Sequence, residues 1–274
     1  MKRLLILISM ALCFLPDAHS RVLVNVNYEG EPLNGKNILK IEQMLGYMSD
    51  FYTSLNVHDT LDVTLIIFKT QEEGYEYMRK LYPKSSRYRK TASNSYFGSG
   101  VGGVYMPDRK TAVVLGIEKG VDRGLNVIYH ELSHHFTHIL FNKINPPIWF
   151  NEGLAEYFEH ARYTKKKGWY VDFPDFAKGK LRTMHMLGEI DLKSLLDIDR
   201  KNFMGKQYNE GQNYYSFAFA AVTILYEKLP QDKFGAMVSR LVDRNTESSI
   251  AEIVNEVYEG GISAFERDFT SFIQ

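Results

Sequence analysis

Cysteine is almost absent from this sequence. The 274 residues include one cysteine, Cys13, which lies in a short apolar run near the N-terminus. Cleavage after Ser20 would remove it and leave a chain with neither thiol nor disulfide. Cysteine metal ligands, cysteine nucleophiles and a disulfide-stapled fold are therefore excluded. A chain of this length can bury a core large enough to make the fold stable without disulfide bonds.

The chain also lacks an excess of either charge. Lys and Arg together number 33, as do Asp and Glu, so the formal net charge is zero. Nucleic acids and anionic membranes both attract proteins with a basic surface. The balance therefore argues against nucleic acid, or an anionic membrane surface, as the main partner. With 45% apolar residues, the composition is that of an ordinary globular protein.

The N-terminal apolar run, residues 4–15, is too short for a comfortable membrane span. It follows two basic residues, Lys2 and Arg3, and Pro16 breaks it ahead of a small-x-small site at 18–20. This pattern predicts a cleavable signal peptide over residues 1–20. An uncleaved anchor is the alternative, which these flanks favour less. We expect a periplasmic or secreted protein with no stable membrane span after signal cleavage.

The most informative stretch is His130-Glu131-Leu132-Ser133-His134, an H-E-x-x-H pattern. On a helix, residues i and i+4 lie one above the other on the same face, so both imidazoles can bind one zinc ion. The glutamate beside the first histidine can then act as a base on water. The pattern arises by chance in about one chain in a hundred of this length.

The surrounding periodicity predicts a helix over about residues 122–141 with two distinct faces. At about 100° per residue, an apolar stripe lies opposite the two histidines. One face would therefore pack on the core while the other presents ligands. The stripe consists of Leu125, Ile128, Leu132, Phe136 and Ile139.

A second helix is predicted to start near residues 148–149, just after the prolines at 146–147. Three glutamates lie on its polar face, within about 60° of one another by helical geometry. Of these, Glu156 is placed either to hydrogen-bond a ligand histidine or to stay solvated. The three are Glu152, Glu156 and Glu159.

The H-E-x-x-H stretch followed by Trp149-Phe150-Asn151-Glu152-Gly153 resembles the gluzincin clan of zinc peptidases. More closely, it resembles the peptidase MA-like domains of secreted bacterial proteins. The resemblance is specific over about residues 125–160 and weaker elsewhere. It implies that the glutamate of the N-E-G segment, Glu152, is the third zinc ligand beside His130 and His134.

The resemblance also implies how the remaining groups would act. The three ligands would leave a fourth zinc position for water. Glu131 would take a proton from that water and pass it to the leaving amine. A tyrosine well downstream would donate to the oxyanion. Tyr215 fits this role best by its spacing and Tyr214 is the second choice, although either tyrosine could instead pack at a helix start.

Several other motifs are excluded. A metzincin would need glycine and histidine where the chain has Thr137 and Leu140. The glycines at 98–103 match a dinucleotide fingerprint, but no helix can follow them at once because Pro107 comes too soon. The segment 102–106 lacks the glutamate with which clan aminopeptidases bind a substrate's amino terminus, so exopeptidase specificity is unsupported. His135, which points away from the ligand face, is expected to be either a structural residue or a residue at the rim of the site.

Alternating and helical periodicities together predict an α+β fold. The resemblance implies a zincin-like, single peptidase domain over 21–274: an α/β lobe with a small mixed sheet (21–141), a mainly helical lobe (142–274), and the active-site helix between them. Strands are expected at 21–28, 61–68 and 111–115, with a short strand or hairpin at 169–173. Further helices are expected at 37–55, 71–81, 176–187, 192–198, 213–229, 233–242, 249–258 and 265–273.

These observations predict a zinc-dependent hydrolase, specifically a metallopeptidase acting on a peptide or protein substrate. The alternative is a non-catalytic zinc-binding module that serves in binding or assembly at the cell envelope. A purely structural zinc site has no use for Glu131, so its presence favours the enzyme. The sequence gives neither the cleavage preference nor the oligomeric state.

Overall fold

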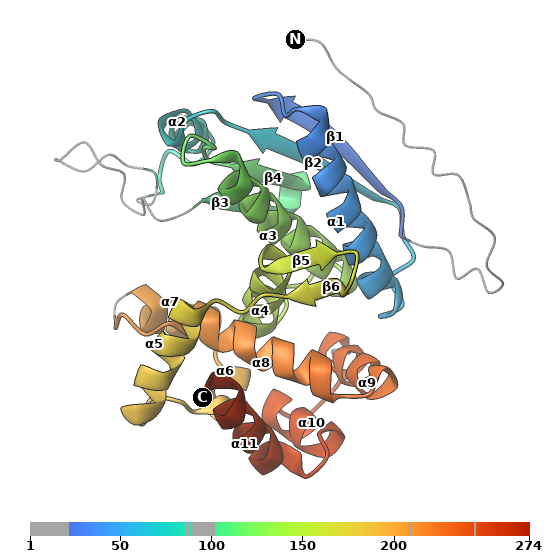
Figure 1. Cartoon of the computed structure of the whole chain (residues 1–274), viewed down its shortest axis with the longest axis vertical. Helices are drawn as coiled ribbons and strands as arrows, with labels where there is room; N and C mark the ends of the chain where they lie inside the picture. Colours follow the sequence, from blue (N-terminus) through green and yellow to red (C-terminus); the bar gives the residue numbers. More distant parts are fainter. Residues whose placement is uncertain (1–21, 86–87, 89–101, 209, 244) are drawn as a thin grey trace. The chain divides into compact units, whose positions relative to one another are not determined.

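The computed structural model describes residues 22–85, 88, 102–208, 210–243 and 245–274 (Figure 1). The predicted signal peptide lies outside the described residues, as do positions 98–101 of the rejected dinucleotide motif. The fold is α+β with a small mixed sheet, as the sequence predicted. Contacts divide the chain into two compact units, Met1–Phe136 and Thr137–Gln274.

The first unit contains a four-stranded sheet in the order β1-β2-β4-β3. β1 pairs with β2 and β2 with β4 in parallel, whereas β3 runs antiparallel to β4 at the edge of the sheet. All four residues of β4 are buried, as a central strand requires. The strands are Val24–Gly30 (β1), Leu61–Ile67 (β2), Gly103–Met106 (β3) and Thr111–Val114 (β4).

Three helices belong mainly to this unit: α1 (Gly35–Thr53), α2 (Gln71–Leu81) and α3 (Val121–Leu140). α2 begins at a capping box, in which the hydroxyl of Thr70 accepts a hydrogen bond from the backbone N–H of Glu73 and the Glu73 carboxylate accepts one from the N–H of Thr70. Tyr52 of α1 stacks on Phe136 of α3, with ring centroids 4.9 Å apart. The apolar stripe of α3 therefore packs against α1 at this point.

The second unit is mainly helical, and α8 (Tyr214–Lys228) lies at its centre, because residues 216–225 are all buried. α4, α5, α7, α9 and α11 all contact α8. The other helices are α4 (Ile148–Glu159), α5 (Asp175–Met186), α6 (Leu192–Leu196), α7 (Arg200–Tyr208), α9 (Gln231–Val242), α10 (Ile250–Val257) and α11 (Gly261–Ile273). A two-stranded hairpin, β5 (Ala161–Thr164) and β6 (Gly168–Val171), follows α4.

α4 and α8 approach each other closely at Gly153. A Cβ atom built on this glycine would lie 2.6 Å from the backbone oxygen of Ala218 and 2.6 Å from a methyl carbon of Val222. Real Cβ atoms are not found at such distances, so only glycine allows this helix spacing. The glycine of the N-E-G segment therefore has a packing role that is independent of metal binding.

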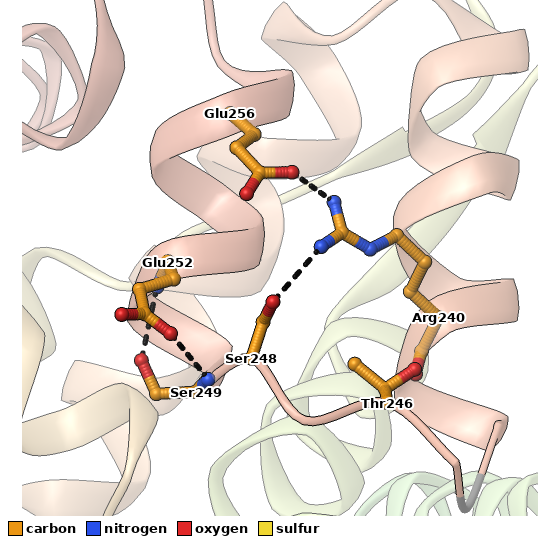
Figure 2. A network of polar contacts seen from close by, with 6 residues as sticks. All are labelled: Arg240, Thr246, Ser248, Ser249, Glu252 and Glu256. Atoms are coloured by element: carbon orange, nitrogen blue, oxygen red, sulfur yellow. Dashed lines mark hydrogen bonds and ion pairs between the residues drawn. The ribbon is translucent and has the colours of Figure 1, made fainter.

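α9 and α10 are joined by the polar network drawn in Figure 2. The guanidinium of Arg240 on α9 is paired with Glu256 of α10 and donates to the hydroxyl of Ser248, 3.4 Å away. At the start of α10, Ser249 and Glu252 form a capping box, with N–H to oxygen distances of 3.2 and 2.8 Å. The network fixes where α10 begins relative to α9.

Most predicted helices are confirmed within a few residues, and the predicted helix 71–81 has the same ends as α2. α7 and β5 are among the elements that were not predicted. α7 buries only Phe203, so its sequence carries no apolar period. β5 has four residues, of which only Ala161 is buried, and the predicted strand at 169–173 proved to be its partner, β6. Among the described residues, no helix is both long and apolar enough to cross a bilayer.

Candidate metal centre

The two motif histidines lie side by side on α3. His130 and His134 are both half-buried, and their ring centroids are 4.9 Å apart with the ring planes almost perpendicular. On the opposite side of the helix, Leu132 and Phe136 are completely buried. The predicted division of this helix into a core face and a face carrying the two imidazoles is therefore confirmed for these four residues.

Glu131 is 6% exposed, and its carboxylate lies against the edge strand β3. A Cβ atom built on Gly103 of that strand would lie 2.6 Å from both Cγ and Oε1 of Glu131. The lack of a side chain at position 103 therefore makes room for the carboxylate. Sequence reasoning missed this relation, because nothing in the sequence indicates that residues 103 and 131 meet.

His135 belongs to the core, which agrees with the structural one of the two predicted alternatives. It is completely buried, and its Nδ1 lies 2.8 Å from the hydroxyl of Tyr105 on β3. Burial raises the pKa of Tyr105, so that hydroxyl keeps its proton. The contact joins α3 to the edge strand at the residue directly after His134, which helps to fix the rotation of the helix about its axis.

Glu152, the predicted third ligand, lies on α4 and is 5% exposed. Just after α3, Phe141 contacts Phe150 of α4, with ring centroids 5.9 Å apart. One turn beyond Glu152, the Oε2 atom of Glu156 lies 3.7 Å from Nδ1 of His160. His160 was assigned no role from the sequence. Its i+4 spacing from Glu156 is nevertheless the pattern that favours a side-chain contact between two residues on a helix.

The predicted ligand set meets a simple distance test for a metal site. One ligand atom from each of His130, His134 and Glu152 lies within 4.8 Å of the other two. Ligands of tetrahedral zinc are about 3.3 Å apart, so small side-chain rotations would complete such a site. Two imidazoles and a carboxylate suit zinc, although the set does not identify the metal. A second group, His130, Glu156 and Glu159, meets the same distance limit.

The two candidate tyrosines at the start of α8 have different surroundings. The charges of Glu152 and Glu156 act on Tyr215, whose hydroxyl lies 3.4 Å from that of Tyr208. Burial first, and then the Glu152 charge, raise the pKa of Tyr215 far above its usual range. Both rings lie 5.6 Å from the ring of Phe203, but Glu152 and Glu156 are not among the charges that act on Tyr214. Tyr208 was not singled out from the sequence.

No protein-family model matches this chain, and no curated protein is significantly similar to it in sequence. The gluzincin resemblance therefore remains a prediction from the two motif stretches.

Proposed function

We propose that this chain is a zinc-dependent hydrolase, a metallopeptidase of gluzincin type with a zincin-like fold that acts outside the cytoplasm on a peptide or protein substrate. One observation carries the proposal. The ligand atoms of His130, His134 and Glu152 lie within metal-binding distance of one another, and the adjacent Glu131 is not one of them. Glu131 thus lies next to the ligand set in the sequence without belonging to it.

His130, His134 and Glu152 would hold the metal. When bound, zinc would supply Lewis acidity and lower the pKa of water to about 7. Glu131 would accept a proton from a water molecule while the oxygen of that water attacks the scissile carbonyl carbon. The same carboxyl would then give that proton to the amine nitrogen as the carbon–nitrogen bond breaks.

Tyr215 would donate a hydrogen bond to the carbonyl oxygen as negative charge develops on it. Its raised pKa supports this role, because the hydroxyl keeps its proton over the whole range in which a peptidase works. Its electrostatic coupling to Glu152 also supports the choice of Tyr215 over Tyr214.

The variant Glu131→Gln tests the proposal, because the amide keeps the shape of the side chain but cannot accept the proton. We expect the variant to keep its zinc, measured by elemental analysis, and to lose about a hundredfold or more of its rate on a peptide library. Glu266→Gln, the same change at an exposed site on α11, is the matched control and should keep the wild-type rate.

Two results would overturn the assignment. If Glu131→Gln holds zinc and hydrolyses peptides at the wild-type rate, Glu131 is not the base. If the zinc-loaded wild-type chain cleaves no member of the library, the non-catalytic zinc-binding module becomes the better description.

A further inference from the structure

The β5–β6 hairpin has an unusual composition for a chain without net charge. Its sequence from Ala161 to Val171 contains four basic residues and no acidic one. Three of the basic residues are consecutive, Lys165 to Lys167, and form the turn between the strands. The same eleven residues contain two tyrosines and a tryptophan. The whole-chain charge therefore conceals a local concentration of positive charge and aromatic rings.

The aromatic residues are ordered by the register of the hairpin. Tyr163 and Trp169 are directly paired across the strands, and their ring centroids lie 5.5 Å apart. Tyr163 is nevertheless 55% exposed. The ammonium of Lys167 lies 4.7 Å from the centroid of the Tyr170 ring, a cation–π contact. The hairpin thus presents amphipathic rings next to ammonium groups.

The charges at the turn are accessible. Lys165, Lys166 and Lys167 are all exposed, and in the part of the chain that the structure describes none of them is paired with a carboxylate. The fourth basic residue, Arg162, is used differently, because its guanidinium donates to the backbone oxygens of Glu159 and Ala161, each 2.9 Å away. Arg162 holds the base of the hairpin, and the three lysines remain for a partner.

We propose that the β5–β6 hairpin is a docking element for an anionic phospholipid surface. Tyrosine and tryptophan rings partition into the headgroup region of a bilayer, and lysines near an anionic leaflet are attracted to it. The two features occur together at the turn end of this hairpin. The docking is peripheral, so it needs no spanning segment, and it does not depend on the proposed peptidase activity.

The composition favours lipid over nucleic acid, the other common polyanion. Three lysines would neutralise only about three phosphates, so counterion release from a duplex would contribute little affinity. A Tyr–Trp pair at the tip adds affinity for a lipid interface without further charge. The absence of net charge on the whole chain argues against a broad polyanion surface, but it does not oppose a local contact of three lysines.

The chain carries its own probe for this contact. It has two tryptophans, of which Trp149 is completely buried and Trp169 lies in the hairpin. We expect the full chain to float with vesicles that contain phosphatidylglycerol more than with pure phosphatidylcholine vesicles. Its tryptophan emission should shift to shorter wavelength on the anionic vesicles alone. Trp169→Phe should abolish the shift.

The triple variant Lys165→Ser, Lys166→Ser, Lys167→Ser tests the turn directly. Each lysine is worth about a fivefold change in partitioning, so the variant should bind anionic vesicles on the order of a hundredfold more weakly. A matched control removes three scattered exposed lysines of the same unit: Lys180→Ser, Lys201→Ser, Lys233→Ser. The control should bind like the wild type, and any contribution from the N-terminal apolar run is common to all the proteins.

Three outcomes would overturn the proposal. The first is wild-type binding that does not distinguish anionic from neutral vesicles. The second is equal loss of binding in the turn variant and in the scattered control, which would indicate a general charge effect. The third is a chain that binds soluble polyphosphate or duplex DNA through these lysines but binds no vesicles.

Discussion

Gly103 lies directly against the carboxylate of Glu131, so that a Cβ atom at position 103 would meet Cγ and Oε1 of that glutamate at 2.6 Å. Gly103 is on the edge strand β3, and Glu131 is on α3. The proposed general base is thus held partly by the shape of a strand that carries no catalytic group. An alanine at this site would change the position of the base without changing its chemistry.

We predict that Gly103→Ala lowers the peptidase rate and leaves zinc content unchanged. The added methyl group would push the Glu131 carboxylate aside, and displacement of a catalytic group by about 1 Å can cost about a hundredfold in rate. The loss should appear in kcat more than in KM, because the substrate contacts are untouched. Steady-state kinetics of the zinc-loaded variant provide the measurement.

Gly102→Ala is the matched control for this prediction. A Cβ atom there would meet a methyl carbon of Val127 at 2.8 Å, and one at Gly103 would meet the other methyl carbon at 2.7 Å. Both variants therefore crowd Val127, but only Gly103→Ala crowds Glu131. If both variants lost the same fraction of the wild-type rate, general packing strain would explain the loss, and the position of the base would not.

We predict that Tyr215→Phe reduces kcat at every pH between about 6 and 9 by the same factor, about tenfold to a thousandfold. Burial raises the pKa of Tyr215, so its hydroxyl does not ionise in this range and contributes no limb to the pH profile. Tyr214→Phe should keep the wild-type kcat. A larger loss in Tyr214→Phe than in Tyr215→Phe would transfer the role to Tyr214.

The sequence predicted the helix with the two motif histidines well, because α3 carries its information locally. Helical periodicity alone separates His130 and His134 from the buried Leu132 and Phe136. The predicted helix 71–81 also has the ends of α2, and in the structure Thr70 and Glu73 form a capping box at its start. Where the residues that define an element all lie close together along one helix, the sequence alone was sufficient to predict that element.

The relations that the sequence did not reveal join residues that are distant along the chain. Nothing in the segment 102–106 indicates that its second glycine faces Glu131. The contact between Tyr208 and Tyr215 joins two different helices, α7 and α8, and α7 itself has no apolar period. Such contacts depend on how distant segments pack together. This packing cannot be read from the spacing of residue types along the chain.

Variants of Glu152 and Glu156 should distinguish the proposed carboxylate ligand from a residue that only supports the metal site. We predict that Glu152→Ala weakens zinc binding by more than about a hundredfold, whereas Glu156→Gln weakens it by about a hundredfold at most. A chelator should lower the melting temperature of the wild type, because zinc binds only the folded chain, and should have no effect on Glu152→Ala. Wild-type zinc affinity in Glu152→Ala would exclude this residue as a ligand.

The last prediction concerns the glycine that follows Glu152. We expect Gly153→Ala to lower the free energy of unfolding by about 1–3 kcal/mol, because its methyl group would press on the backbone oxygen of Ala218 and force α4 away from α8. Urea unfolding measures the change. Gly235→Ala, in a helix with open space around the glycine, should instead stabilise the chain by up to about 1 kcal/mol. If Gly153→Ala were as stable as Gly235→Ala, the close contact between α4 and α8 would not exist.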